Sequence, residues 1–412
     1  MYKPNILALC HLIMQFAIFP RLFKAALQLV QQSAFSLEGA ILPAAAGVLV
    51  ESEGGSLRLT ATTLTTSLST TVPLAGNSTG TMSTVVDARL LTQILGQLPP
   101  KQETRFLYAA ADELLVITGP KGQFRQGGEA SSNFPRPKQL QAFGNRATLP
   151  AKALHKALLT IEPCILSSSK ISQAYTAGLL RLRGQRAVLQ ATGGFFAASC
   201  EVREVETTAQ AELMLPLAAV RLLIAQLGRE EVRGEVVVNW NETSAEFSFG
   251  HPLVRLSTQL VEDTMPPVDN HLLPDPKRVP VLVDKEVLRL MALRLRPFST
   301  KNQAFFSFAD DRISVAVSRP EWGREATEWQ PAQVNGPAPE LQINLKFLAR
   351  LLEVLDTQEV ELSLPHVSGG VMRLLPGSEA KAPYLYNTTL VLATILPDVV
   401  EEMEEAQVEE EF

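Results

Sequence analysis

The sequence predicts an α+β protein in which one amphipathic helix and about four antiparallel strands recur six times. The first observation behind this prediction is a short apolar strand followed by a helix, which is found in six places. The expected helix starts are Pro20, Asp87, Pro150, Pro216, Asp284 and Asn344, at intervals of 67, 63, 66, 68 and 60 residues. The second observation is that the intervening stretches alternate between apolar and polar residues, with Gly, Asn and Asp turns. The regular interval indicates internal repeats, and the alternation indicates strands.

The stretch from Ala211 to Gly228 shows the repeated unit most clearly. Pro216 is expected at the first helical position. The N–H of any residue there lacks a partner within the helix, so the missing N–H of proline costs nothing. Gly228 is expected to end the helix. Positions +3, +4, +7 and +8 from the proline lie on one helical face. They hold Ala219, Val220, Leu223 and Ile224.

The other helices repeat this pattern. Asp87, Asp284 and Asn344 are residue types that cap helix N-termini, so three of the boundaries have a physical cause. Five copies carry apolar or Ala residues at the same four positions, and the first copy fits when its register is moved by about one residue. Strand-rich stretches begin at Leu57, Arg105, Ala174, Glu235, Ala304 and Val360.

Pairing consecutive repeats gives three tandem domains, each with two helices packed on two antiparallel sheets and with the helices on one side. The expected domains are residues 14–144, 145–275 and 276–396, with an N-terminal extension at 1–13 and an acidic disordered tail at 397–412. The boundaries are expected in two stretches rich in Pro, at Phe134 to Asn145 and at Pro266 to Pro276. The outer repeats of such an array need partners.

The composition, 46% hydrophobic and 19% charged, is typical of a soluble globular protein. Cys10, Cys164 and Cys200 are far apart, which favours a reducing, cytoplasmic setting over a disulfide framework or metal cluster. We find no GxSxG, P-loop, GxGxxG after a strand, or His and Cys set with metal spacing, so no enzyme, cofactor or metal is expected. Residues 1–13 are consistent with a signal peptide or with a working start at Met14.

Charge is distributed unevenly along the chain. The segment from Pro397 to Phe412 carries eight carboxylates, so the net charge of −6 becomes −6 + 8 = +2 without it. The six helices together hold 12 Lys or Arg and four acids, an excess of +8. Many of these bases lie opposite the apolar face. A solvated face is the usual interpretation of helix charge, but a one-signed face repeated through an array suits phosphate contacts to a nucleic acid. The bases expected to face it are Lys24, Arg89, Lys152, Lys156, Arg221, Arg289, Arg294, Lys346 and Arg350.

From Met14 to about Leu396 the chain resembles the bacterial sliding clamp, the beta subunit of DNA polymerase III. The matching segments are MQFAI before the first helix, LRLTATTLTTSL, GPKGQFRQGGEASSNFP, YTAGLLRL and QATGGFFAAS, in the family's order and spacing. The resemblance implies a head-to-tail homodimer that closes a ring of six domains, whose outer sheets pair edge to edge across domain and subunit boundaries. Its helices would line a hole for double-stranded DNA. The implied role is a non-catalytic processivity factor in DNA replication. Lys170 and Tyr175 match family positions that reach the duplex, although an exposed loop lysine and a half-buried tyrosine explain them equally well.

The resemblance also implies an apolar groove for short peptides of DNA polymerase and clamp-loader subunits. By position it contains Thr176, Thr192, Gly194, Phe195, Phe196, Ala197, Pro266, Leu272, Val391, Leu392, Ala393 and Thr394. The chain departs from the family here, because Gly193, Phe195 and Phe196 replace polar residues and the last strand, LVLATIL, lacks methionines. Thr63 also replaces a usual Asp, and SAFSLEG lacks a base. The two phenylalanines either make a more apolar pocket or pack in the interior.

Two alternatives stay open from the sequence. The chain is consistent with a clamp-fold paralogue that serves other partners, or with a protein-binding repeat scaffold that forms no ring. The acidic tail, which the family lacks, is expected to be solvated. A second hypothesis is that its end, QVEEEF at Gln407 to Phe412, folds back into the groove as a competitor, or that its charge repels DNA.

Overall fold

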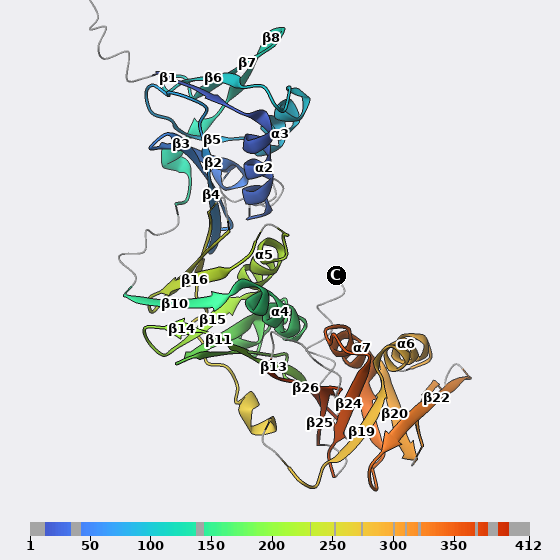
Figure 1. The fold of residues 1–412 in the computed structure, drawn as a ribbon. Coiled ribbons are helices and arrows are strands. Elements are labelled where there is room, and N and C mark those ends of the chain that lie inside the picture. The colour runs from blue at the N-terminus through green and yellow to red at the C-terminus, as the bar shows by residue number, and fades with distance from the viewer. Residues whose placement is uncertain are drawn as a thin grey trace, which may run out of the picture. The chain divides into compact units, whose positions relative to one another are not determined.

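The computed structural model of the chain describes residues 13–33, 43–136, 144–230, 232–250, 253–272, 275–299, 301–309, 311–319, 323–366, 370–377 and 386–394. The expected N-terminal extension, except Ile13, and the acidic tail lie outside these residues, as does most of the SAFSLEG loop. The chain divides into two compact units (Figure 1). Unit 1 is Met1–Arg146 with Arg229–Gln259, and unit 2 is Ala147–Gly228 with Leu260–Phe412.

All six predicted helices are present at their expected places. They are α2 (Pro20–Val30), α3 (Ala88–Gln97), α4 (Ala151–Ile161), α5 (Leu217–Leu227), α6 (Lys285–Leu295) and α7 (Leu345–Glu353). They pack in consecutive pairs, α2 with α3, α4 with α5, and α6 with α7, each pair on one side of its sheets (Figure 1). This confirms the α+β class and the helix repeat.

The polar N-caps act as predicted. The Asp87 carboxylate accepts hydrogen bonds from the backbone N–H groups of Arg89 and Leu90, at 2.9 and 3.1 Å. Asp284 and Asn344 cap α6 and α7 in the same way. These bonds satisfy donors that a helix N-terminus leaves unpaired.

The roles of Pro216 and Gly228 at the ends of α5 differ from the prediction. Pro216 is the N-cap, not the first helical residue, because it is still extended and paired with Ala177 in the sheet. Gly228 ends the helix in a right-handed conformation (φ −72°). A Cβ there would lie 3.1 Å from His155 Nε2, so this residue is small because His155 of α4 approaches it closely.

The buried face of α5 is also slightly rotated from the expected one. Ala219, Val220 and Leu223 are buried, but Ile224 is partly exposed, and Gln226 and Leu227 complete the buried face. Pro150 likewise belongs to the preceding strand, and only Pro20 occupies the first turn of its helix. The proline signal therefore marks the strand-to-helix junction to within one residue.

Unit 1 contains two antiparallel sheets. One has the order β1 (Ile13–Ile18), β6 (Thr104–Ala109), β7 (Leu114–Gly119) and β8 (Gly122–Gly127). The other has the spatial order β16 (Glu235–Trp240), β17 (Ser244–Phe249), β18 (Val254–Gln259), β4 (Thr66–Pro73), β3 (Ser56–Thr62), β2 (Val48–Glu53), β5 (Ser83–Val86) and β9 (Glu129–Ala130). The Phe16 and Phe106 rings stack at 5.0 Å, and Phe23 of α2 meets Phe106 edge-on.

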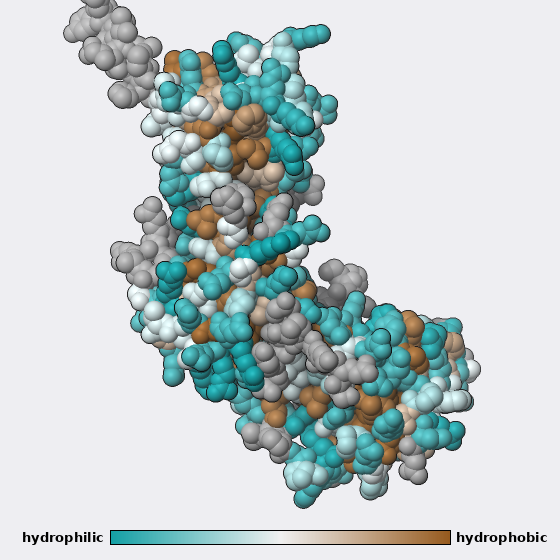
Figure 2. Space-filling view, in the orientation of Figure 1, coloured by the Kyte–Doolittle hydropathy of each residue, from teal (hydrophilic) through white to brown (hydrophobic). Residues whose placement is uncertain are grey.

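Unit 2 contains a large antiparallel sheet. Its order is β15 (Ala211–Pro216), β11 (Ala177–Arg183), β12 (Arg186–Thr192), β13 (Phe196–Arg203), β26 (Tyr386–Ala393), β25 (Val371–Pro376), β24 (Glu359–Leu364), β19 (Val279–Asp284), β22 (Arg324–Val334), β21 (Arg312–Arg319), β20 (Gln303–Ala309) and β23 (Leu341–Asn344). The short strands β10 (Asn145–Pro150) and β14 (Glu206–Thr207) pair through Ala147 and Thr207. Hydrophilic residues cover most of the surface seen in Figure 2, with apolar residues between them.

Strands pair across the predicted domain boundaries. In unit 1, β4 of the predicted first domain pairs with β18 of the predicted second, with Leu68 opposite Leu256. In unit 2, β13 pairs with β26 of the predicted third domain. The expected edge-to-edge pairing is thus confirmed within the chain, and such pairing hides sheet edges. The division into three domains itself stays a prediction.

No helix in the described ranges is long and apolar enough to cross a membrane.

Candidate functional site

A cavity of about 150 Å³ lies on one face of the large sheet in unit 2. Its floor comes from paired strands, with Ala197 of β13 opposite Val391 of β26, and Val371 of β25 opposite Ala393. Ala197, Val268 and Val391 form a buried apolar cluster beneath it. The lining residues are Tyr175, Thr192, Gly194, Phe195, Phe196, Ala197, Pro266, Pro267, Val268, His271, Val371, Val391 and Ala393.

Most of the residues predicted for the peptide groove meet at this cavity. Eight of the twelve line it, namely Thr192, Gly194, Phe195, Phe196, Ala197, Pro266, Val391 and Ala393. The other four lie beside it. Leu272 packs against the apolar cluster, and Leu392 is fully buried, opposite Phe196. The hydroxyls of Thr176 and Thr394 donate to backbone oxygens of Gln173 and Gly370, each at 2.8 Å.

The structure adds lining residues that the sequence did not suggest. Pro267, Val268 and His271 belong to the Pro-rich stretch of which only Pro266 and Leu272 were predicted to lie in the groove. Val371 lies one strand further along the sheet. Tyr175, predicted as a DNA contact, also lines the cavity and is partly exposed. No alternation marked Val371 in the sequence, since Met372, Arg373 and Leu374 after it are all buried.

The two phenylalanines of the altered loop have different roles. The Phe196 ring is 3% exposed and packs against Phe347 of α7, with ring centroids 4.3 Å apart. Phe195 is partly exposed and lines the cavity. Gly193 belongs to the same arrangement, because a Cβ there would lie 2.4 Å from Phe196 Cζ. One phenylalanine therefore serves packing, and the other widens the apolar surface of the cavity.

Two short 3₁₀ helices form the walls of the cavity. One, Gln173–Thr176, carries Tyr175, and the other, Val268–His271, carries Val268 and His271. The first is held by Asp263, whose carboxylate accepts from Ser172 Oγ at 2.6 Å and from the Ala174 N–H at 3.0 Å. The Ser172 hydrogen bond, with the backbone donors, lowers the pKa of Asp263, so it is ionised at neutral pH.

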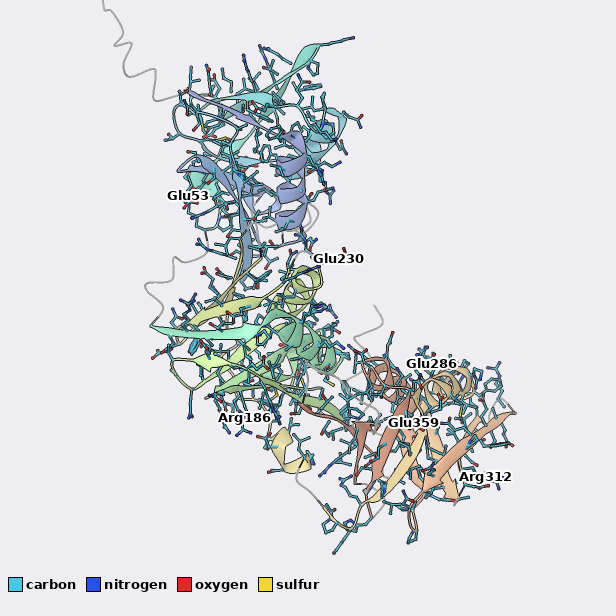
Figure 3. The ribbon with its side chains drawn as sticks, viewed as in Figure 1. Glu53, Arg186, Glu230, Glu286, Arg312 and Glu359 are labelled. Atoms are coloured by element: carbon cyan, nitrogen blue, oxygen red, sulfur yellow. The ribbon has the colours of Figure 1, made fainter. Side chains whose placement is uncertain are left out.

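Several of the predicted DNA-facing bases are ion-paired on the helix surfaces. Arg221 Nε lies 2.8 Å from Glu162 Oε1. Arg289 Nη2 lies 2.7 Å from Glu286 on the same helix, and Figure 3 labels Glu286 on α6. Arg294 Nε donates to Glu328 at 2.9 Å, and Lys156 pairs with Asp356. Glu162, Asp356 and Glu328 lie outside the helix segments counted in the sequence, so the surface is more mixed in sign than that count indicated.

An excess of positive charge remains on the helices. Within the described part of the chain, no ion pair involves Lys24, Arg89 or Lys152, and Arg89 and Lys152 are exposed. Lys346 and Arg350 are partly exposed on α7. Lys170 is exposed in the loop before the Tyr175 wall. These side chains have the chemistry for exchangeable phosphate contacts.

Neither a metal-binding cluster nor an exposed thiol is found among the described residues. No group of three or more His, Cys, Asp or Glu in the described ranges is placed to hold a metal ion. Cys164 and Cys200 are fully buried, and burial raises the pKa of the Cys200 thiol to about 12. A thiol held protonated in this way is a poor nucleophile.

The sequence and the fold of the chain were compared with those of known proteins. No protein-family model matches the sequence. The chain is 23% identical over 358 residues to the beta sliding clamp of Synechococcus elongatus, covering 83% of this chain and 91% of that protein. Two similar solved structures are the DnaN sliding clamp of Pseudomonas aeruginosa bound to griselimycin (TM-score 0.82, 19% identity) and the DNA polymerase III beta subunit of Thermotoga maritima (0.79, 18%). Each match covers 93% of this chain and 99% of the other.

The fold, with its paired helices, is therefore that of the bacterial sliding clamps. The particular resemblance inferred from the sequence is confirmed: the chain is a divergent relative of the bacterial beta clamp, similar along nearly its whole length.

Proposed function

We propose that this protein is a DNA sliding clamp, which encircles double-stranded DNA and tethers a replicative polymerase to it. The observation that carries the proposal is the coincidence of the clamp fold, over 93% of the chain, with basic side chains on the outer faces of the repeated helices. A head-to-tail homodimer would close the ring in the cytoplasm. Unpaired bases such as Arg89 and Lys152 would then line the DNA channel.

The mechanism is topological and needs no catalysis. Enclosure holds the DNA, so the contacts to it must be weak enough to exchange as the ring slides. Phosphate contacts carry no sequence information, and ion-paired arginines such as Arg221 bind phosphate more weakly than free ones. The mixed-sign helix surface is compatible with sliding, because tight phosphate binding would stop it.

Retention on DNA after loading is the decisive test. We expect the protein to stay on nicked circular DNA and to run off the same DNA once it is linearised. Light scattering is expected to give about twice the 45.0 kDa mass of one chain. Equal retention on circular and linear DNA would refute enclosure, and a monomer at micromolar concentration would favour a repeat scaffold that forms no ring.

The cavity on unit 2 is proposed as the site for partner peptides of polymerase and clamp-loader subunits. Its support is the meeting of eight predicted residues in one mainly apolar hollow, in line with the usual character of ligand sites. Griselimycin, which the Pseudomonas aeruginosa clamp binds, is a suitable probe. We expect wild-type protein to bind it and Phe195→Ala to bind about tenfold more weakly, because an aromatic lining side chain is lost. Phe124→Ala, at an exposed phenylalanine of unit 1, is the matched control.

A second candidate is a clamp paralogue with different partners. It is favoured by the apolar character of the loop around Phe195, where the family has polar residues. Such a protein would be retained on circular DNA but would neither bind griselimycin nor increase the processivity of the host's replicative polymerase. Stimulation of that polymerase would exclude the alternative.

A further inference from the structure

The 3₁₀ helix at Val268–His271, η6, lies between two hollows on the same sheet face. On one side Val268 and His271 line the candidate peptide groove. On the other side Asp269 and Leu272 line a second cavity of about 540 Å³, whose other walls include Arg181, Gln190 and Thr389. This one short helix therefore contributes a wall to both cavities.

Asp269 connects η6 to the sheet. Its Oδ2 accepts from Arg181 Nη1 at 3.0 Å, and its Oδ1 accepts from Gln190 Nε2 at 2.5 Å. The donors come from β11 and β12, which lie beside the floor strand β13 in the same sheet. Both donors are themselves fixed: Gln190 is 1% exposed, and Arg181 Nε also donates to Glu212 at 2.7 Å.

The electrostatics of this contact favour the charged form of Asp269. Partial burial would raise the pKa of its carboxyl, but the hydrogen bonds from Gln190 and Arg181 outweigh burial and hold that pKa below its usual value. Both carboxylate oxygens are engaged, each by a different strand. The Asp269 side chain is 58% exposed, so solvent screens this ion pair. Its two charge-assisted hydrogen bonds still give the four-residue helix a directional attachment to the sheet.

The other described contacts of η6 fix it less completely. Val268 is 4% exposed and packs on Ala197 and Val391. The backbone bonds, from Val268 N–H to Pro266 and from Leu272 N–H to Asp269, stay within the segment itself. Packing of one valine is non-directional, so it holds η6 near the sheet without defining its rotation. Asp269 supplies the direction.

We propose that Asp269, acting through Arg181 and Gln190, is a positioning residue that holds η6 as a wall of the peptide groove and so sets the groove's affinity. The predicted effect on griselimycin binding rests on the proposed function, whereas the predicted effect on amide hydrogen exchange does not. By analogy, Asp263 holds the opposite wall, so both walls are fixed by aspartates of a single segment.

The test is Asp269→Asn, which keeps the shape and removes the charge. We expect amide hydrogen exchange across residues 262–272 to rise about fivefold, griselimycin binding to weaken about fivefold, and exchange in β11 and β12 to stay unchanged. Glu262→Gln is the matched control, because Glu262 is an exposed acid on the same segment that enters neither contact. Unchanged exchange across residues 262–272 in Asp269→Asn would overturn the inference.

A double-mutant cycle separates positioning from general stabilisation. Since Asp269 acts partly through Arg181, the combined effect of Asp269→Asn and Arg181→Met on exchange and binding should be smaller than the product of the two single effects. Full additivity would overturn the stated route. If wild-type protein fails to bind griselimycin, the griselimycin readout and the replicative-clamp proposal fail together, while hydrogen exchange still decides whether Asp269 positions η6.

Discussion

Replacing Gly193 by Ala tests the arrangement at the edge of the groove. Gly193 does not adopt the left-handed conformation, so its backbone accepts alanine. The added Cβ would lie 2.4, 2.8 and 3.0 Å from three atoms of the Phe196 ring, well inside the ~3.5–4.0 Å of ordinary carbon contacts. The ring cannot retreat freely, because Phe347 lies against it with centroids 4.3 Å apart. Overpacking of this kind costs about 1–3 kcal/mol of unfolding free energy.

The effect of Gly193→Ala on the unfolding free energy should change sign once the Phe196 ring is removed. Phe196→Ala alone is expected to cost about 3–5 kcal/mol. Adding Gly193→Ala to it should then be neutral or stabilise by about 0.4–1 kcal/mol, because alanine reduces the freedom of the unfolded chain. Urea denaturation of the four proteins measures both steps. Gly122→Ala is the control, since nothing lies within 4 Å of its Cβ. Equal destabilisation by Gly193→Ala in both backgrounds would refute the reasoning.

Three further predictions concern the core, a helix cap and the thiols. Leu223→Ala should lower the unfolding free energy by about 2–5 kcal/mol, because the side chain is fully buried on α5; a loss under 1 kcal/mol in urea denaturation would contradict this. Asp87→Ala should cost about 1 kcal/mol through the two lost N-cap bonds, with a normal far-ultraviolet spectrum. In a Cys10→Ser variant at pH 8, Cys164 and Cys200 should resist thiol reagents until denaturant is added, since burial raises both pKa values; rapid labelling of native protein would oppose that.

Local signals were enough to predict the helices and the strand-rich stretches. A helix is specified by the spacing of its apolar residues and by caps such as Asp87, all within a dozen residues. In the structure Asp87 does cap α3. The errors concerned the ends of α5, where contacts with other parts of the fold determine the conformation. Pro216 remains extended because the sheet continues to it, and Gly228 is small because His155 approaches from another helix. Neither cause is visible within the sequence of α5.

The candidate groove could be predicted only in part and only through the resemblance. Residues on the strands, such as Ala197 and Val391, fell into place because the resemblance identified these two stretches, which pair with each other in the structure. The wall at Val268–His271 did not, because its sequence has no periodic pattern and its position depends on the Asp269 contacts with distant strands. Charge pairing was missed for the same reason, since the partners of Arg221 and Arg294 come from elsewhere in the chain.

The pairing of β4 with β18 has a consequence for synthesis on the ribosome. Strand β4 is complete at Pro73, but its partner edge is not made until Gln259 has emerged. During that interval a strand that ends up in the middle of a sheet has an open edge, which is the kind of surface that aggregates or recruits chaperones. A fragment ending at Arg146 would keep that edge exposed permanently. Any piece expressed for study should therefore extend past Gln259, and nascent chains stalled before it are where holdase binding should peak.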